Sequence, residues 1–437
     1  MKHDPRRLIV KFRTLLKDLE PSPELYAKRP GLDFSRNRKL PFPRLIELLV
    51  SMGGASLSRE LRRAFRFDPA YPSPSAFCQQ RSKLLPSALP AVLSASLQAF
   101  PCKKRFNGYR LIACDGSGVG FPYNASEKDF FVQHSSKFRG SNYLYLTALY
   151  DLCEKQYLDA NLRPGTSPDE YLSFNTLIDR FPPDDKTIFV ADRGFESFNT
   201  FAHLIEKGFF FLIRVKSPDS NKILRGCKLP VNCSFDRSFH LILTRKKHAL
   251  YRDHPETYRI ICANHRFDFW DRYPDGMYPL SFRAVAVPLK HGEYEYLITN
   301  LDPDRFPPDM LRYIYRLRWG IETSFRHLKY TIGLVNFHSK KAAFVCQEIF
   351  ARLILFNLCQ RVASQLDLSR STKSHVYVLN FSDTADVFRH LFSLPQDVSP
   401  PDTASLLSIC LHPLKPDRSF PCQVRPHAAV SLMYRVP

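Results

Sequence analysis

The sequence lacks several features that would assign it to common classes of protein. No stretch approaches the ~18 uninterrupted apolar residues of a membrane span, and residues 1–20 contain no apolar signal-peptide core. Internal repeats and low-complexity tracts are absent as well. The eleven cysteines include no C-x2-C pair, which argues against structural zinc. Those in apolar runs are expected to be buried free thiols in a reducing cytoplasm: Cys114, Cys153, Cys346 and Cys359.

Acidic residues are scarce relative to basic ones. The 437 residues include 63 Lys and Arg against 42 Asp and Glu, a formal net charge of +21. Residues 1–105 alone hold 21 basic and 8 acidic side chains. A surplus of this size favours a polyanionic partner, nucleic acid first and an anionic membrane surface second. The membrane alternative has no amphipathic anchor in the sequence to support it, and 44% hydrophobic residues indicate a globular chain.

The order of predicted elements divides the chain into five parts. Residues 1–105 are expected to be a helical, basic region that binds DNA. Residues 106–216 predict three strands, a helix, a strand, a helix and a strand, which is an α/β sheet of mixed direction. Residues 217–305 predict aromatic strands and therefore an inserted β subdomain. A long helix and a second, apolar helix follow in 306–368, and residues 369–437 have no assigned role other than as a candidate dimerisation region.

Two short helices in the N-terminal region resemble a helix-turn-helix. They are "SLSRELRRAF" and "SPSAFCQQRSKLL", joined by a turn that contains proline. The second helix would present Gln79, Gln80, Arg81 and Lys83 to DNA. The alternative, two ordinary surface helices of a small bundle, stays open from the sequence.

Two predicted strands end on a carboxylate. "YRLIACDGSGV" is an apolar run that ends in Asp115 and small residues, and "KTIFVADRGF" stops on Asp192. Carboxylates at strand ends lie at the rim of a sheet, where open α/β folds bind ligands. Divalent cations such as Mg2+ prefer oxygen ligands, and few of these need come from protein. Taken alone, each aspartate is more often a turn residue or a helix cap.

The segment "YRLRWGIETSFRHLKY" carries a single carboxylate, Glu322, among several cations. At about 100° per residue, four of its side chains share one narrow stripe with a fifth at its edge: Tyr315, Arg318, Glu322 and Lys329, then Arg326. Glu322 taken alone is more often the salt-bridge partner of Arg318, worth only ~0.3–0.5 kcal/mol. With the two strand-end aspartates it can instead complete a set of ligands for two ions ~3.5–4 Å apart.

The spacing Y-x2-R-x3-E-x6-K at these positions resembles the signature of a large group of bacterial insertion-sequence transposases. These are DDE enzymes with a ribonuclease-H-like core. The group's "DG" matches Asp115–Gly116, and its "DRGF" matches residues 192–195. The 129 residues between Asp192 and Glu322 leave room for the β insertion of that group. The resemblance covers about residues 108–365 and is weak outside that span.

The resemblance implies a fold class and a set of roles. The fold would be α/β, a ribonuclease-H-like mixed sheet with an inserted β subdomain and a helical N-terminal DNA-binding region. Asp115, Asp192 and Glu322 would be the catalytic, metal-binding triad for two Mg2+ ions, which Mn2+ can replace. Arg318 and Lys329 would clamp phosphates near the 5′ end of the non-transferred strand. The residues implied to bind DNA are Tyr315, Arg318, Lys329, Arg326, Arg193, Arg214, Lys216 and Trp270.

The two tryptophans are assigned different roles. Relatives in this group free the element through a hairpin and stack a flipped base on a Trp of the insertion. Trp270, in "FDFWDRYP", is the only Trp of the predicted insertion and is the candidate for that stacking. A core or surface aromatic of the β subdomain is the alternative. Trp319 flanks Arg318 and is predicted to pack.

Together these expectations describe a transposase that binds the terminal inverted repeats of an insertion sequence and cleaves the DNA at its ends. It would join the 3′-OH ends to target DNA and act as a homodimer on double-stranded DNA, in the bacterial cytoplasm near the nucleoid. A hairpin route or another cleavage route stays open. Two alternatives remain: a ribonuclease-H-like structure-selective DNA nuclease, and a non-catalytic DNA-binding protein derived from a transposase.

Overall fold

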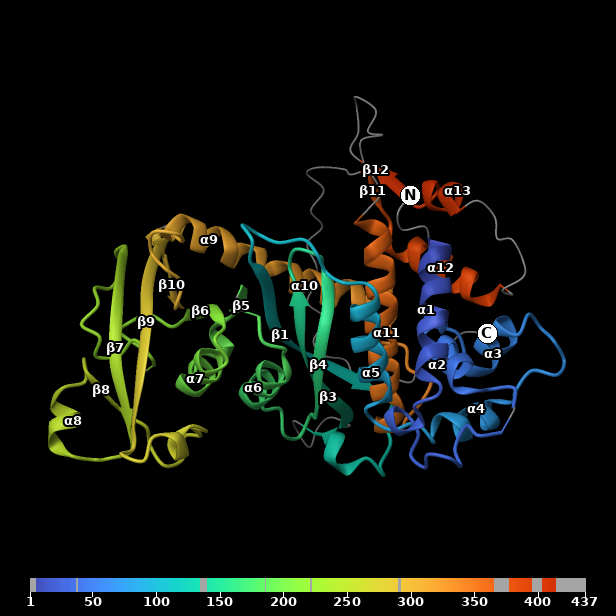
Figure 1. Cartoon of the computed structure of the whole chain (residues 1–437), viewed down its shortest axis with the longest axis horizontal. Helices are drawn as coiled ribbons and strands as arrows, with labels where there is room; N and C mark the ends of the chain where they lie inside the picture. The colour runs from blue at the N-terminus through green and yellow to red at the C-terminus, as the bar shows by residue number, and fades with distance from the viewer. Residues whose placement is uncertain are drawn as a thin grey trace.

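The computed structural model describes residues 5–364, 377–394 and 403–413, except for 37, 134–139, 185, 221 and 290–291. Much of the predicted region 369–437 therefore lies outside the described residues. A ten-stranded sheet runs through the molecule, and the N-terminal helices gather around one long helix at one end of it (Figure 1).

The secondary structure follows the predicted order. The α-helices are α1 (Pro5–Leu19), α2 (Phe42–Ser51), α3 (Leu57–Ala64), α4 (Pro74–Arg81), α5 (Ala88–Ala99), α6 (Glu170–Arg180), α7 (Phe198–Glu206), α8 (Ala249–Asp253), α9 (Pro308–Leu317), α10 (Trp319–Arg326), α11 (Ala342–Ala363), α12 (Phe381–Ser393) and α13 (Thr403–Ser408). The main strands are β1 (Arg110–Phe121), β2 (Phe131–Val132), β3 (Ser141–Asp151), β4 (Gln156–Pro164), β5 (Thr187–Ala191), β6 (Phe210–Val215), β7 (Phe235–Thr244), β8 (Tyr258–Ile260), β9 (Met277–Pro288) and β10 (Tyr294–Thr299).

Five strands form the core of the sheet in the order β4-β3-β1-β5-β6. β1, β3 and β4 are antiparallel neighbours, whereas β5 and β6 run parallel to β1. This confirms the mixed α/β fold and is the ribonuclease-H-like arrangement that the resemblance implies. Side chains alternate across β5. Phe189 packs in the hydrophobic cluster that includes α6 and α7, and Ile188 packs in the one that includes α9.

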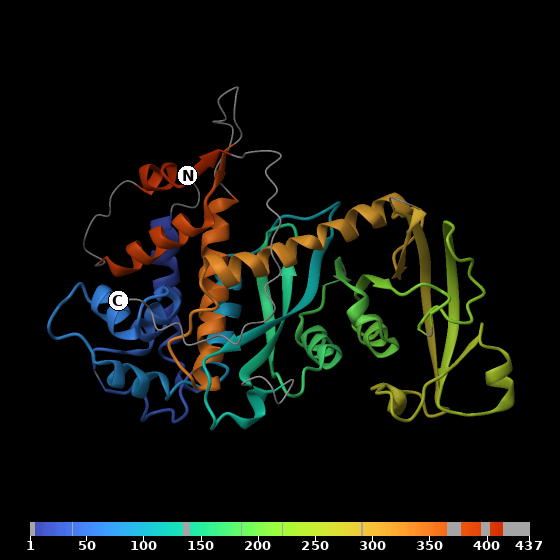
Figure 2. The same cartoon turned by 180° about the vertical axis from the view of Figure 1, so that it is seen from behind.

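Helices therefore cover both faces of the core sheet. α6 and α7 lie on one face, and α9 and α10 cross the other as a nearly continuous rod that runs from β10 toward α11 (Figure 2). α10 packs on β1, and β1 is paired with β5, so three segments that are distant in the sequence are brought together.

The strands between residues 217 and 305 continue the core sheet. β10 pairs with β6, β9 pairs with β10, and β7 pairs with β9, all antiparallel. The predicted β content of the insertion is present. The sequence did not indicate that its last strand would be hydrogen-bonded to the core, because pairing partners cannot be read from a single segment.

β1 is longer than the sequence predicted. The segment after Asp115 was expected to be a turn, but the strand continues to Phe121 and stays paired with β3 along its length. The glycines that suggest a turn instead make room for aromatic side chains of the neighbouring strand. A Cβ atom at Gly118 would collide with the hydroxyl of Tyr143. Asp115 therefore lies within a strand, not at its end.

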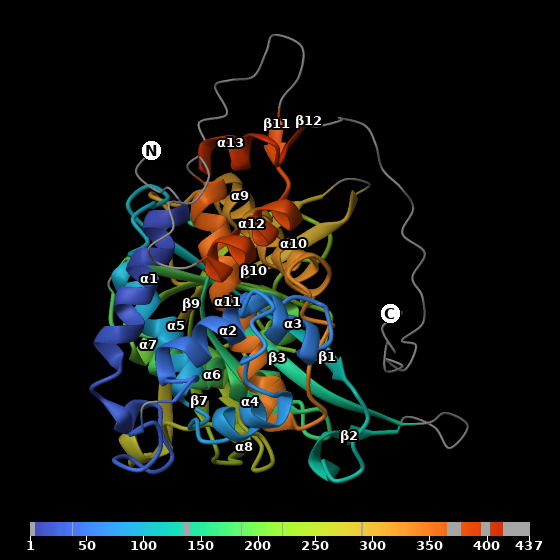
Figure 3. The same ribbon diagram turned by 90° about the vertical axis from the view of Figure 1, so that its right-hand side faces the viewer.

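The N-terminal helices share a hydrophobic core with the core sheet. Buried residues of α1, α2, α5, β3, β4 and α11 belong to one cluster. Figure 3, seen from this end, shows α11 enclosed by α1, α2, α5 and α12. α11 is long and apolar enough to cross a membrane by composition alone, but 89% of that stretch is buried inside the molecule. It is therefore the core helix around which the N-terminal region is built.

The helix-turn-helix interpretation is wrong for two of its four candidate residues. Arg81 is fully buried and its Nη1 lies 2.9 Å from Oε1 of Glu348 on α11. Gln80 is buried and donates to the carbonyl of Leu40. Both side chains therefore hold α4 in place and cannot reach DNA. Gln79 is exposed, and the partly buried Lys83 donates to Gln80.

The ten described cysteines are all free thiols. Cys114 and Cys359 are buried as predicted, whereas Cys153 and Cys346 are only partly buried.

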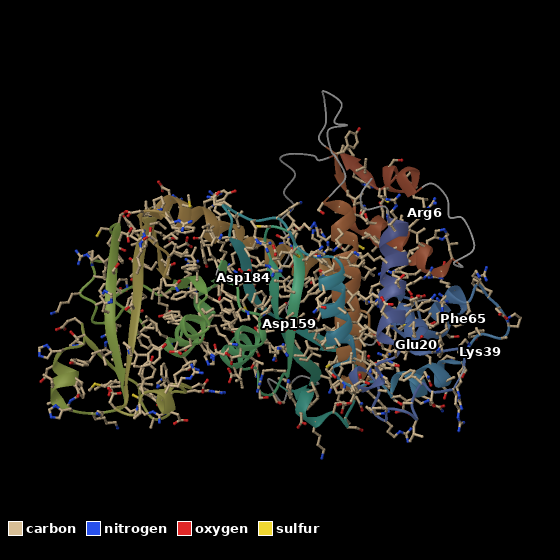
Figure 4. All side chains as sticks on the ribbon, viewed as in Figure 1. Arg6, Glu20, Lys39, Phe65, Asp159 and Asp184 are labelled. Atoms are coloured by element: carbon tan, nitrogen blue, oxygen red, sulfur yellow. The ribbon has the colours of Figure 1, made fainter. Side chains whose placement is uncertain are left out.

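The N-terminal helices and the inserted strands lie at opposite ends of the molecule. Figure 4 labels Lys39 and Phe65, which lie at the outer end of the N-terminal helices, far from the inserted strands.

Candidate active site

Asp115 and Asp192 are neighbours across the parallel pair of β1 and β5. In the register of these strands Cys114 is opposite Ala191, and each is followed directly by one of the aspartates. Asp192 leaves β5 as the N-cap of the short 3-10 helix Arg193–Phe195, and its carboxylate accepts the N–H of Gly194 at 2.8 Å. Asp115 accepts the N–H of Gly116 at 2.8 Å. These hydrogen bonds fix the positions of both carboxylates. Asp192 follows the end of its strand as predicted, whereas Asp115 is held within a strand.

Glu322 reaches the same place from α10, and Arg318 joins it to Asp115. Nη2 of Arg318 lies 2.6 Å from Oε1 of Glu322, and its Nη1 lies 3.8 Å from Oδ2 of Asp115. Arg318 is only 5% exposed, so this cation is held among carboxylates away from water. The structure therefore brings together Asp115, Asp192, Glu322 and Arg318, which the sequence places on three separate elements.

The electrostatics of Asp115 reflect this crowding. The pKa of Asp115 is raised to about 7, first by burial and also by the nearby carboxylates of Asp192 and Glu322, against the hydrogen bond from Gly116 and the charge of Arg318. A carboxylate surrounded by others is stabilised by a cation, because like charges destabilise the ionised form.

The donor set fits a hard divalent cation in its chemistry, since three carboxylates supply only oxygen ligands. In spacing it does not yet form a cage: within the part of the chain that the structure describes, no three acidic, histidine or cysteine side chains are close enough to enclose an ion. The guanidinium of Arg318 lies between Asp115 and Glu322 instead, and its Nε and Nη1 are buried without a hydrogen-bond partner. A positive charge already occupies the space between two of the carboxylates.

Two further residues of the helical stripe show features of an anion site. The hydroxyl of Tyr315 is buried without a hydrogen-bond partner, close to Arg318. Lys329 is half-buried and has no ion-pair partner among the described residues, and burial lowers its pKa. It lies in a π-helical turn, His327–Thr331, where the predicted α-helical spacing no longer holds. Unsatisfied buried donors of this kind suit an external acceptor such as a phosphate oxygen.

The other predicted DNA-binding cations surround this centre at different depths. Arg193 and Arg326 are exposed. Arg214, near the end of β6, lies 3.5 Å from Glu295 on β10, and Lys216 follows β6 with an exposed side chain. The C-terminal ends of β5 and β6 therefore carry positive charge next to Asp192.

The two tryptophans lie in different surroundings. Trp270 packs on Phe267, with Arg245 over its ring at 5.1 Å, and the adjoining Arg272 pairs with Glu206 at the end of α7 away from Asp192. No described contact joins Trp270 to the carboxylates, and its role in base stacking stays a prediction. Trp319 was expected to pack but is 61% exposed. Its side chain lies beside Arg318, at the surface next to the site.

One acid near the site was missed by the sequence. Glu170, in the first turn of α6, is hydrogen-bonded by Tyr145 of β3 and approaches the backbone beside Asp115. In the sequence an acid at this point reads as a helix-dipole residue. Glu170 lies close to Asp115 only because of how α6 packs on the sheet, which the sequence does not reveal.

Comparison with known proteins identifies a family and a relative with similar sequences. Residues 106–358 match the family model described as "Transposase DDE domain". The transposase InsG for insertion sequence element IS4 of Escherichia coli (strain K12) is 27% identical over 154 residues. That alignment spans 33% of this chain and about a third, 34%, of the length of the relative.

A solved structure is also similar. It is a piggyBac transposase synaptic complex with hairpin DNA, determined by cryo-electron microscopy, with a TM-score of 0.47 and 11% sequence identity. The superposition covers 95% of this chain and 87% of that one. A similarity of this size transfers no residue role.

Proposed function

Because the chain belongs to the family of transposases with a DDE domain, we propose that it binds the terminal repeats of an insertion sequence, cleaves the DNA at its ends and joins the 3′-OH ends to target DNA. The observation that carries this proposal is the meeting of Asp115, Asp192 and Glu322 around Arg318. Carboxylates from within β1, from directly after the adjacent parallel β5 and from a crossing helix form the site, beside exposed cations that suit a DNA strand.

The residues would act as follows. The three carboxylates hold divalent cations, which when bound activate the attacking water and stabilise the leaving oxygen. Arg318 releases Glu322 and donates two parallel hydrogen bonds to a phosphate of the DNA. The buried Tyr315 hydroxyl donates to the same strand, which satisfies a group that lacks a partner in the described structure. Arg193, Arg214 and Lys216 hold the backbone on the other side of Asp192.

The N-terminal region is proposed to recognise the terminal repeats, through α3 and the turn after it and not through α4. The exposed side of α3 and the turn after it carries Arg59, Arg62, Arg63 and Arg66. These four arginines replace the α4 residues as candidates for DNA contact, because Gln80 is buried in the protein interior. A strong salt dependence of DNA binding would follow from such phosphate contacts.

The function is tested with the full chain and DNA that carries the inverted repeats flanking this gene, with and without Mg2+. The expected result is Mg2+-dependent strand cleavage at the repeat ends, followed by products joined to a target plasmid. Cleavage without joined products would indicate a nuclease of this fold. Binding without cleavage would indicate a non-catalytic protein, and either outcome would overturn the proposal.

Lys329→Ala should weaken capture of the cleaved end more than it slows the first nick. Its half-buried ammonium has no ion-pair partner in the described structure, and a lost charge-assisted phosphate contact costs about 1–3 kcal/mol. Nick, hairpin and joined products are timed separately on gels. Lys186→Ala removes the same charge from an exposed position before β5, at the end away from Asp192, and is the control. A Lys329→Ala protein that fails already at the first nick would assign Lys329 to the first chemical step instead.

A further inference from the structure

α6 begins with two acids that point to different places. The carboxylate of Asp169 is the N-cap of the helix and accepts the N–H of Leu172 at 2.8 Å. Glu170, the next residue, does not cap the helix. It accepts a hydrogen bond from the hydroxyl of Tyr145 on β3, whose pKa is raised by burial and by this carboxylate. Tyr145 therefore directs Glu170 away from the helix and toward the sheet.

Two glycines of the sequence motifs locate the Glu170 carboxylate. A Cβ atom placed on Gly116 would be 2.8 Å from Oε1 of Glu170 and 2.7 Å from the ring of Tyr145. A Cβ atom on Gly194 would be 3.7 Å from the other oxygen, Oε2. Gly116 follows Asp115 directly, and Gly194 donates its N–H to Asp192. The two oxygens of Glu170 thus lie beside the backbone that holds each aspartate.

The close approach also explains why glycine is needed in the "DG" motif here. Any side chain at position 116 would displace Glu170 or the ring of Tyr145, since contacts under 3.0 Å must be relieved. Gly116 allows the Glu170 carboxylate to lie against β1, and the other side of this carboxylate faces solvent. A depression of about 630 Å3, lined by Tyr145, Arg163 and residues 167–171, gives access to it.

Arg318 reaches Asp115 and Glu322 from the opposite side of the sheet, where α10 packs. Among the described residues no cation forms an ion pair with Glu170 on the α6 side, although Arg163 lines the same depression.

We propose that Glu170 is a fourth carboxylate of the catalytic centre, which binds a divalent cation together with Asp115 and Asp192. The proposal rests on the proposed function and adds a ligand from the α6 side, whereas Glu322 serves from the α10 side. Tyr145 is a positioning residue, because it touches Glu170 and not the reacting atoms. The ordinary alternative is that Glu170 only stabilises the N-terminus of α6 through the helix dipole.

The test measures binding of Mn2+ to the full-length protein by electron paramagnetic resonance, in the absence of DNA. Glu170→Gln is expected to weaken Mn2+ binding by about 10- to 100-fold, the range known for changes close to a metal site. Tyr145→Phe should weaken it less, because the carboxylate stays but loses its orientation. Glu170→Asp should recover part of the affinity.

Asp169→Asn is the matched control. It removes the same charge one residue earlier at the same helix end, and asparagine caps a helix as well as aspartate does. A purely structural or dipolar role predicts equal effects at the two positions. Mn2+ binding that is unchanged in Glu170→Gln, equally weak in Asp169→Asn, or missing in the wild-type protein would overturn the proposal.

Cleavage assays separate this proposal from the proposed function. In Glu170→Gln the Mg2+ concentration for half-maximal cleavage should rise by about tenfold or more, and the rate should recover in part at high Mg2+. A slower rate with an unchanged Mg2+ requirement would overturn the ligand role. A wild-type protein that binds Mn2+ through Glu170 but cuts no repeat DNA would overturn the transposase function and leave the fourth carboxylate standing.

Discussion

Replacing Glu322 by glutamine is expected to abolish DNA cleavage and to leave DNA binding largely intact. The amide keeps the shape of the side chain but loses the negative charge that a divalent cation requires. Cations in such sites supply several kcal/mol of transition-state stabilisation, so cleavage should fall by about 10^3-fold or more. Asp115→Asn and Asp192→Asn should have effects of the same size, because the three carboxylates act as one set and their losses do not add.

These variants are compared in parallel gel-based cleavage and DNA-binding assays. Asp184→Asn is the control for an aspartate lost beside the same strand. Asp184, labelled in Figure 4, accepts the N–H of Lys186 before β5, at the end away from Asp192. A Glu322→Gln protein that cuts at nearly the normal rate, or an Asp184→Asn protein as inactive as Asp192→Asn, would contradict the assignment of the triad.

Arg81→Ala is expected to destabilise the whole protein by about 3–5 kcal/mol, because it leaves the buried carboxylate of Glu348 without its cation. Arg81 contacts Glu348 at 2.9 Å, donates to Gln347 and Phe344, and has no exposed surface. Arg272→Ala breaks an ion pair with Glu206 at the surface and should cost at most about 1 kcal/mol. Urea unfolding followed by circular dichroism measures both, and equal losses would contradict the prediction.

The same ion pair predicts a dependence of stability on pH. Burial alone would raise the pKa of Glu348, but Arg81 and the hydrogen bonds from His338 lower it from 4.5 to about 2. A carboxyl group whose pKa is lowered on folding stabilises the protein above its ordinary pKa. That contribution should be complete above about pH 4.5 and should be lost as the pH falls toward 2. In Glu348→Gln this acid-dependent part of the unfolding curve should be missing.

The sequence predicted the parts of the site that depend on local pattern. Asp192 was expected after a buried strand and is found there, because an apolar run followed by "DRG" has few other structures available. The order of strands and helices in the core was predicted for the same reason. Helix geometry predicted that Arg318 and Glu322 share one face of the helix, and they lie 2.6 Å apart as the ion pair that was the alternative to a metal-binding role. The same geometry does not extend to Lys329, which lies in a π-helical turn.

What the sequence could not predict depends on contacts between distant segments. β1 passes through "DGSG" as a strand because aromatic side chains of β3 fill the space above the glycines. Arg81 has the sequence features of a DNA-reading residue, and only its contact with α11 shows that it is buried. Glu170 lies beside Asp115 because Tyr145, on another strand, holds it there. Each of these errors concerns a side chain whose partner is far away in the chain.

The position of α11 has a consequence for synthesis of the protein. α5 ends at Ala99 and α11 begins at Ala342, so the ribosome makes about 240 residues between them. At about 5–20 residues per second, the apolar faces of the N-terminal helices remain without the helix that buries them for roughly 12–50 s. During that time they are substrates for chaperones and proteases. In a chain interrupted before Ala342, the region proposed to bind DNA ends would lack the helix on which it packs, so a partial translation product is not expected to occupy the repeats.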